Sequence, residues 1–351
     1  MAQRKTWSGR VSRLVGHLAP GATGAQQSES LFMPRFMTEL HMEPQPVEQI
    51  VCRRPHPPAD ATVEDKISFF REAGYVIVEN SLHGEVLSAA QAEFTDGAES
   101  MRPLWTEAKS HGTELEIDGY GPMKNVPQEW FDIPRYAERG TASLNVLANE
   151  KNLELLHEIV GPDLALSQIQ ARTYPPQPPD LLAEHGGYAG WHRDTGGPGG
   201  VGFEHPERAL RVKCFVYLFD TPPDCGCTCV VPGSHRWRFS ASDGPNEGRF
   251  TGAKMTDMPG AVKVSCKAGT SMIFDLRTWH AAFPNTSELE RRCLILSYTP
   301  FWHKPFGQVI DNGRRLLAAG KLDGSEPRQK KLRQLLHIPA EDDSGCEHVI
   351  S

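Results

Sequence analysis

The order of apolar and polar residues predicts five helices. The first precedes Gly74, a residue type that commonly ends helices, and the third stops at Gly161 and Pro162. The predicted helices cover residues 65–73, 84–94 and 149–159 and two segments around Arg314 and Lys331. These helices flank a middle portion of the chain that has a different pattern.

Short apolar runs between turn sequences predict strands in this middle portion. Clusters of Pro and Gly, such as the one at residues 221–224, separate the runs. The predicted strands cover residues 75–78, 165–172, 211–219, 227–231, 271–275 and 293–298. Short strands at this spacing favour a β-sandwich or barrel over a doubly wound parallel sheet. We therefore expect a mainly β fold with flanking helices.

The same pattern divides the chain into three parts. Residues 1–60 mix Gly, Ala, Ser, Gln and Pro without sustained periodicity, which predicts a flexible leader. Residues 61–303 form the predicted domain, and residues 304–351 add C-terminal helices and a polar tail. Within the domain, residues 100–140 combine aromatic residues with Gly and Pro. This composition suits a lid over a site or a surface loop pinned by aromatic side chains.

Charge and composition exclude two classes of partner. The 37 basic and 44 acidic residues give a net charge of -7, so no excess of cations is available to bind nucleic acid. No stretch approaches about 18 consecutive apolar residues, so no membrane span is predicted. Cys227 and Cys229 are interpreted as small apolar side chains on one strand face, because the sequence has no Cys-x-x-Cys pair for zinc.

The sharpest chemical feature is a His-x-Asp pair. His192 and Asp194 are two residues apart and therefore project from the same face of an extended segment. His280 follows a hydrophobic strand far downstream, and Arg291 comes eleven residues later. Two imidazoles and one carboxylate can hold Fe(II) while leaving positions open for a co-substrate and dioxygen. Arginine supplies a fork of N–H groups that binds a carboxylate.

These residues lie in motifs that resemble the phytanoyl-CoA dioxygenases, a branch of the Fe(II)- and 2-oxoglutarate-dependent oxygenases. The resemblance covers about residues 65–303. Its motifs are FFREAGYVIVEN at 69–80, WHRD at 191–194, GCTCVVPGSH at 226–235 and HAAFPNTS at 280–287. The resemblance implies a double-stranded β-helix core of the jelly-roll or cupin type. It also implies oxidation of a substrate coupled to conversion of 2-oxoglutarate and dioxygen to succinate and carbon dioxide.

The resemblance assigns roles to individual residues. It implies that His192, Asp194 and His280 are the catalytic iron ligands and that Arg291 binds the distal carboxylate of 2-oxoglutarate. Arg292 is the competing candidate for this clamp. The family's spacing from the second histidine favours Arg291, and a shift of one residue along a strand would turn the side chain to the opposite face.

Further residues are predicted to line the co-substrate pocket. Phe215 stands where the family often has a Trp, so the aromatic contact is kept without the indole N–H donor. Gln168, Gln170 and Arg172 share one face of their strand, which looks either into the site or to solvent. The resemblance gives His235 a structural role in a turn.

Asp194 also bears on the type of reaction and on the substrate. Related halogenases lack a carboxylate at this position, so that chloride can bind iron, and a carboxylate therefore favours hydroxylation. The first choice of substrate is a branched fatty acyl-CoA, and an amino acid or a secondary metabolite is the alternative. A binding module that uses the same barrel without catalysis is a further interpretation, against which the intact triad argues.

The leader carries a separate pattern. Arg10 and Val11, followed after five residues by His17 and Leu18, resemble the N-terminal peroxisomal targeting pattern. This predicts a peroxisomal protein with the import receptor as a partner. An acid-poor leader with arginines also fits a mitochondrial transit peptide, and a cytoplasmic location is the third alternative.

Overall fold

A computed structural model describes most of the predicted domain and the C-terminal helices. The described residues are 52–112, 115–117, 121–123, 130–178, 191–194, 209–236, 260–303, 307–324 and 326–339. The targeting pattern at Arg10, Val11, His17 and Leu18 lies outside these residues and stays a prediction. Within the described ranges, no helix is long and apolar enough to cross a membrane.

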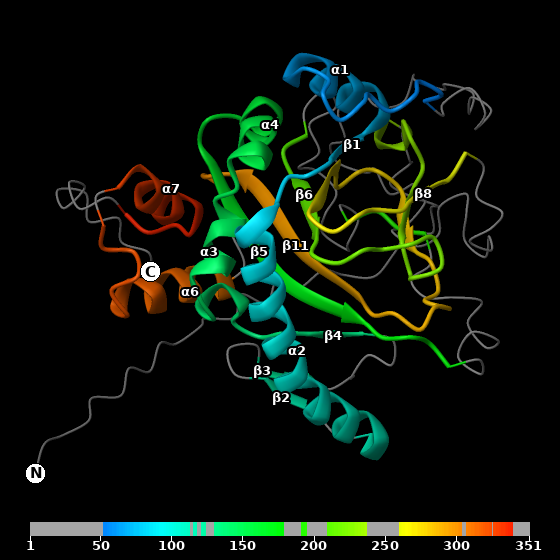
Figure 1. Cartoon of the computed structure of the whole chain (residues 1–351). Helices are drawn as coiled ribbons and strands as arrows, with labels where there is room; N and C mark the ends of the chain where they lie inside the picture. The colour runs from blue at the N-terminus through cyan, green and yellow to red at the C-terminus, as the bar shows by residue number, and fades with distance from the viewer. Residues whose placement is uncertain are drawn as a thin grey trace, which may run out of the picture. The chain divides into compact units, whose positions relative to one another are not determined.

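Two antiparallel sheets form the core (Figure 1). The large sheet has the strand order β1-β9-β6-β11-β5-β4, and the small sheet has the order β10-β7-β8. The strands of the large sheet are β1 (Tyr75–Val78), β4 (Phe131–Asp132), β5 (Leu164–Tyr174), β6 (Val212–Tyr217), β9 (Thr270–Asp275) and β11 (Arg291–Pro300). The small sheet contains β7 (Thr228–Val230), β8 (Val262–Val264) and β10 (His280–Ala282), and β2 (Leu115–Ile117) pairs with β3 (Gly121–Met123) elsewhere.

All six predicted strands are present, and the mainly β prediction is confirmed. β11 begins earlier than predicted, so that Arg291 and Arg292 are strand residues. β8 and β10 were not predicted, because three residues are too few for a strand pattern to stand out from the surrounding sequence. Cys229 lies in β7, and Cys227 and Cys229 are both buried free thiols, as expected.

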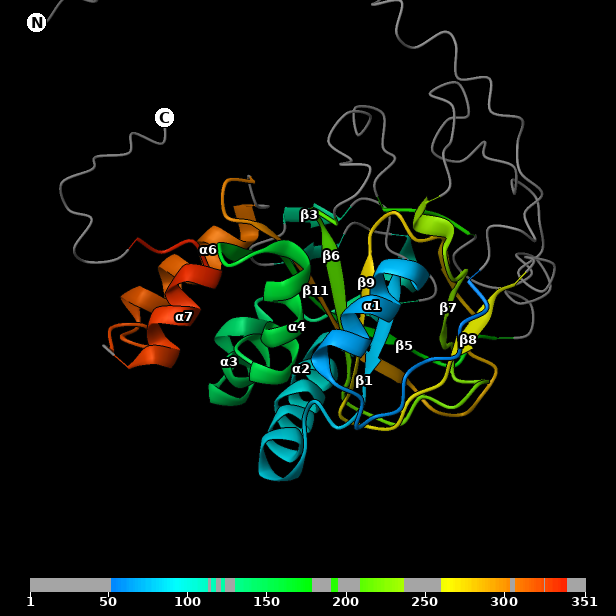
Figure 2. The same cartoon turned by 90° about the horizontal axis from the view of Figure 1, so that it is seen from above.

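Helices cover the face of the large sheet that points away from the small sheet (Figures 1 and 2). They are α2 (Gly84–His111), α3 (Thr141–Leu147), α4 (Glu150–Val160), α6 (Gly307–Ala318) and α7 (Pro327–Leu335). α1 (Val63–Ala73) packs beside β1 and α4. Thr62 caps α1 by accepting a hydrogen bond from the Asp65 backbone N–H, and Gly74 ends it with φ of 79°. The predicted helices are therefore all present.

α2 is much longer than predicted, and this changes the interpretation of residues 100–140. Residues 100–111 belong to the helix, so the first part of the predicted lid is instead part of the helical layer. Trp105 is buried in this helix, with its ring 5.2 Å from the ring of Phe131. Gly97 and Pro103 interrupt the helical pattern of the sequence, because both residue types are poor helix formers. Packing against the sheet maintains the helix despite them.

Candidate active site

The three predicted metal ligands converge at one place in the structure. The segment that carries His192 and Asp194 runs beside the start of β10, and His192 and His280 exchange two backbone hydrogen bonds of 3.0 Å. The Asp194 backbone N–H donates to the carbonyl of Leu276. Consequently one ligand atom from each of the three side chains lies within 4.8 Å of the others. His280 Nε2 is 3.2 Å from Asp194 Oδ2, and His192 Nε2 is 3.9 Å from Oδ1.

The His280 imidazole is oriented by the backbone. Its Nδ1 lies 2.9 Å from the carbonyl oxygen of Thr278, and a carbonyl can only accept, so Nδ1 carries the proton. The lone pair of Nε2 is then directed toward Asp194. The ring is 4% exposed and packs 4.9 Å from the Phe274 ring, which restricts its rotation. A fixed imidazole with a free Nε2 is a preformed metal ligand.

Lys213 is a further residue at the triad, which the sequence analysis missed. Its Nζ lies 2.7 Å from Asp194 Oδ2. Burial alone would raise the pKa of Asp194, but its interactions with His280 and with the Lys213 ammonium outweigh burial and hold the pKa well below its ordinary value. The triad therefore offers an ionised carboxylate and two imidazole nitrogens, a donor set that fits Fe(II).

Strand register identifies the interior face of the large sheet. Arg291 in β11 is the cross-strand partner of Tyr174 in β5, so both side chains lie on one face. Tyr217 in β6 lies on this face too, and its hydroxyl donates to Thr228 Oγ1 in β7 of the small sheet, 2.9 Å away. The face that carries Arg291 is thus the one that looks toward the small sheet.

The predicted pocket residues share this interior face. Alternation from Tyr174 along β5, and pairing of β11 with β6, place the predicted residues on it: Gln168, Gln170, Arg172, Phe215 and Arg291. Lys213, which was not predicted, lies on the same face. The three β5 residues therefore lie on the face that looks toward the small sheet, and their role in the pocket stays a prediction. The sequence signal for Lys213 is only its position two residues before Phe215 in the same strand, which puts both on one face but does not show the contact with Asp194.

Arg291 is a buried cation without an acidic partner among the described residues. It is 1% exposed, and its Nη1 donates to the carbonyl of Gly226 at 2.8 Å. Its guanidinium carbon lies 4.6 Å from the centre of the Tyr174 ring and 5.9 Å from that of Phe215, while Nε has no hydrogen-bond partner. Burying a cation in this way is unfavourable unless an anion joins it. The geometry thus suits a carboxylate ligand, and the clamp role stays a prediction.

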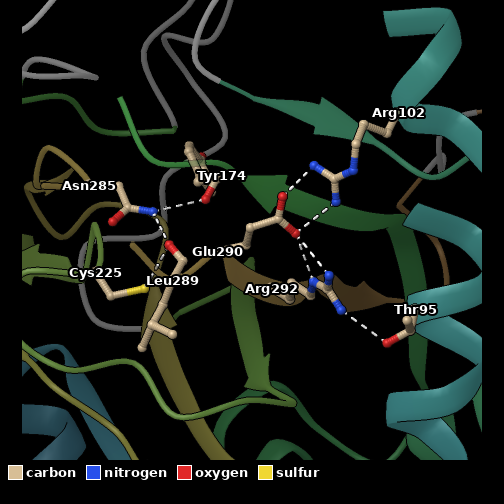
Figure 3. Close-up of polar contacts among 8 residues, drawn as sticks. All are labelled: Thr95, Arg102, Tyr174, Cys225, Asn285, Leu289, Glu290 and Arg292. Carbon is tan, nitrogen blue, oxygen red and sulfur yellow. Dashed lines mark hydrogen bonds and ion pairs between the residues drawn. The ribbon is translucent and has the colours of Figure 1, made fainter. Parts of the chain in front are cut away.

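Arg292 points to the opposite face and is engaged there (Figure 3). Its Nη1 donates to Thr95 Oγ1 of α2 at 2.9 Å, and its Nη2 lies 2.9 Å from Glu290 Oε2. Arg102 of α2 binds the same carboxylate, with Nη2 2.8 Å from Oε2. Arg292 therefore ties β11 to α2 and is not available inside the barrel.

Aromatic rings connect Arg291 with the triad. The Phe215 ring lies 5.1 Å from the Phe274 ring, which in turn contacts His280. Phe215 is 5% exposed. The predicted wall residue therefore lies between the buried guanidinium and the metal ligands, where it keeps water away from both.

A polar cluster lies on the interior face beyond Arg291. Arg172 makes two hydrogen bonds to Asp132 of β4, at 2.7 and 2.8 Å, and Gln170 Nε2 donates to the same carboxylate at 3.2 Å. The Trp130 ring covers the Arg172 guanidinium at 3.5 Å. Asp132 and Trp130 were missed as site residues, because they come from the segment interpreted as a lid or loop and no local motif marks them. The Gln168 Oε1 accepts from Ser297 Oγ at 3.4 Å.

His235 lies outside the triad. It is buried in a short 3-10 helix, η4 (Ser234–Arg236), with Nε2 3.2 Å from the carbonyl oxygen of Arg71 in α1. A Cβ on Gly74 would lie 2.4 Å from its Nδ1, so the absence of a side chain at Gly74 permits this packing. These contacts are those of a structural residue.

Known structures share the fold of this chain. The non-heme alpha ketoglutarate dependent carbocyclase SnoK from nogalamycin biosynthesis is similar with a TM-score of 0.50 and 20% sequence identity. The similarity covers 74% of this chain and 94% of that one. It confirms the predicted double-stranded β-helix core of the jelly-roll type.

Sequence comparison finds two kinds of relative. An ectoine dioxygenase of Stutzerimonas stutzeri is 22% identical over 244 residues, which cover 65% of this chain and 74% of that protein. An uncharacterized protein of Mycobacterium bovis is 38% identical over 93 residues, or 26% of this chain. The match spans 29% of the length of the mycobacterial protein.

A family model adds the decisive comparison. The model described as phytanoyl-CoA dioxygenase (PhyH) matches residues 70–293. This range covers more than half of the chain and contains His192, Asp194, His280 and Arg291. The resemblance seen in the motifs is thereby confirmed, and the chain belongs to the phytanoyl-CoA dioxygenase family of iron- and 2-oxoglutarate-dependent oxygenases.

Proposed function

We propose that this protein hydroxylates an unactivated C–H bond of a small molecule. The observation that carries the proposal is the convergence of His192, Asp194 and His280, whose ligand atoms lie within 4.8 Å of one another. Fe(II) held by these residues would supply the oxidant for hydroxylation from dioxygen and 2-oxoglutarate, which is converted to succinate and carbon dioxide. An ionised Asp194 fills one position of the site, which supports hydroxylation over halogenation.

The interior of the barrel supplies a place for the co-substrate. Arg291 would bind its distal carboxylate, because a buried guanidinium without an acidic partner gains most from an anion. Phe215 and Tyr217 pack around that guanidinium and exclude water. Gln168 and Gln170 lie on the same face, further along β5.

The exposed part of the interior face supports a polar substrate. On the interior face of β5, β6 and β11, the residues that remain partly exposed carry polar groups: Gln168, Gln170, Arg172 and Lys213. The apolar interior residues Phe215, Met272 and Ile295 are buried. An acyl chain placed against the amides would leave their hydrogen-bonding groups without partners, which is unfavourable by about 1 to 3 kcal/mol for each group. A polar metabolite is therefore the better candidate, and a branched fatty acyl-CoA is the alternative.

A two-stage experiment tests the proposal. Anaerobic titration of the protein with Fe(II) and 2-oxoglutarate should give the weak visible absorption of the ternary complex. His280→Ala should abolish the absorption, whereas His157→Ala, which removes a histidine of α4 outside the site, should not. Succinate release is then measured in air with a panel of polar metabolites and branched acyl-CoAs. Equal absorption in wild type and His280→Ala would contradict the metal site, and stimulation by acyl-CoAs alone would contradict the polar substrate.

For the leader, we propose the peroxisomal location that its pattern predicts. Residues 1–30 fused to a fluorescent protein should enter peroxisomes, and His17→Asp should leave the fusion in the cytosol. A mitochondrial transit peptide depends on distributed positive charge instead, so His17→Asp alone should matter little to it. Import into mitochondria would therefore contradict the peroxisomal proposal.

A further inference from the structure

Lys213 places a positive charge inside the candidate metal site. It lies on the interior face of β6, where Phe274 of β9 and Ser297 of β11 are its cross-strand neighbours. Its side chain is 13% exposed, and its Nζ is 2.7 Å from Asp194 Oδ2. In the described part of the chain, Lys213 forms its ion pair with Asp194. The lysine therefore cannot be treated as a surface charge that solvent screens.

The formal charges make this arrangement unusual for a cation site. The triad contributes one negative charge, from Asp194, and two neutral imidazoles. Lys213 cancels that charge, so the site is neutral before a divalent cation enters. Any cation bound by Asp194 lies within a few ångströms of the ammonium, because Nζ already contacts the carboxylate. Like charges this close in a shielded site repel each other strongly.

The Lys213 ammonium repels a bound cation, but it attracts an anionic co-substrate. The dianion 2-oxoglutarate is attracted both to the bound cation and to the nearby ammonium. Lys213 thus disfavours the metal alone and favours the metal together with the anion. If one ligand changes the affinity of a protein for a second ligand, the second ligand changes the affinity of the protein for the first by the same factor.

We infer that Lys213 couples metal binding to co-substrate binding, by weakening the binding of the bare cation at the triad and strengthening the binding of the anion beside it. The inference rests on the proposed iron and 2-oxoglutarate chemistry. It would favour loading of the metal when the co-substrate is present. The simpler alternative is that Lys213 only orients the Asp194 carboxylate by a hydrogen bond.

The two explanations predict opposite effects on metal affinity. If Lys213 only orients Asp194, its removal should weaken metal binding, as loss of such partners does by about ten- to a hundredfold. If its charge dominates, removal should strengthen binding of the bare metal. Lys213→Met and Lys213→Gln both remove the charge, and the glutamine keeps a hydrogen-bond donor. Lys213→Arg keeps the charge.

The test uses Mn(II) as the probe on the full chain, with free Mn(II) measured by electron paramagnetic resonance. We expect Lys213→Met and Lys213→Gln to bind Mn(II) alone on the order of tenfold more tightly than wild type. Saturating 2-oxoglutarate should tighten Mn(II) binding to wild type, and this gain in affinity should be smaller by a similar factor in the two charge-removing variants. Lys213→Arg should resemble wild type. Lys263→Met is the control, because Lys263 is an exposed residue of β8 that lies over Phe283. It should bind Mn(II) as wild type does, with and without the co-substrate.

The outcomes separate the inference from the function on which it rests. If wild type binds no Mn(II), the proposed metal site is wrong and the inference falls with it. If wild type binds Mn(II) and the charge-removing variants bind it equally or more weakly, the metal site stands and the inference is overturned. Lys213→Gln and Lys213→Arg keep the test decisive if Lys213→Met does not fold, as judged by circular dichroism and thermal unfolding.

Discussion

Arg291 in β11 faces Tyr174 in β5, with its guanidinium carbon 4.6 Å from the centre of the tyrosine ring. This pairing turns Arg291 into the barrel, and the alternation of the strand turns Arg292 toward α2. Two adjacent arginines thus have different surroundings. Arg291 lies among aromatic rings and has no acidic partner among the residues that the structure describes, whereas Arg292 is held by Glu290.

The first prediction separates these two arginines. Arg291→Ala should raise the KM for 2-oxoglutarate about ten- to a hundredfold, because a hydrogen-bonded ionic contact of about 1.5 to 3 kcal/mol is lost from a shielded site. The KM for the prime substrate should change far less. Steady-state kinetics with each substrate varied in turn will check this. A larger effect from Arg292→Ala would show that the clamp is the other arginine.

The second prediction concerns the ion pairs in Figure 3. Glu290→Ala should destabilise the protein by about 1 to 3 kcal/mol, because it leaves Arg292, 18% exposed in its side chain, without its carboxylate. Arg102 is 35% exposed in its side chain, so Arg102→Ala should reduce stability by less than about 1 kcal/mol. Urea unfolding of Glu290→Ala, of Arg102→Ala and of the double variant gives the coupling energy between the two side chains. Additive effects would mean that the two side chains do not interact in solution.

The third prediction concerns Asp194. Asp194→Gly should open a coordination position and lower hydroxylation by at least about a hundredfold, because an iron ligand and its charge are lost. Azide or chloride should then perturb the visible spectrum of the Fe(II) and 2-oxoglutarate complex. Asp194→Glu keeps the carboxylate but places it at the wrong reach, since such sites tolerate about half an ångström. Hydroxylation by Asp194→Gly at the wild-type rate would exclude Asp194 as a ligand.

The fourth prediction is a pH dependence of stability set by His235. Burial, opposed in part by the charge of Asp275, lowers the pKa of His235 to about 4 in the folded protein, against about 6.5 in an unfolded chain. Between these values the unfolded state binds more protons, so stability falls as the pH is lowered from about 6.5 to about 4. At pH 4.5 the free energy of unfolding should be lower than at neutral pH by about 2.5 kcal/mol on account of His235.

His235→Asn isolates this effect. Asparagine keeps a polar side chain but does not titrate, so the stability of the variant should fall less steeply over the same pH range. Urea unfolding of wild type and variant at pH 4.5, 5.5 and 6.5 gives the comparison. A stability difference that stays constant with pH would show that His235 does not change its protonation on unfolding.

Local periodicity in the sequence was enough to predict much of this protein. The alternation of residues 165–172 and 211–219 predicted strands, and it put Gln168 and Gln170 on one face before the register was known. Motif spacing singled out His192, Asp194 and His280, whose convergence the structure shows. These features are readable because each depends on residues that are close in sequence or on a motif that the family shares.

Tertiary structure alone decided the rest. Lys213 contacts Asp194 because β6 lies beside β9, and the Asp194 backbone N–H bonds to the carbonyl of Leu276 just after β9. No local pattern encodes that proximity. Asp132 reaches Arg172 only because β4 pairs with β5 at the edge of the sheet. α2 continues past Gly97 and Pro103 because its buried face packs on the domain core. In each case the free energy comes from contacts between segments far apart in the chain, whereas sequence patterns report only what neighbouring residues favour.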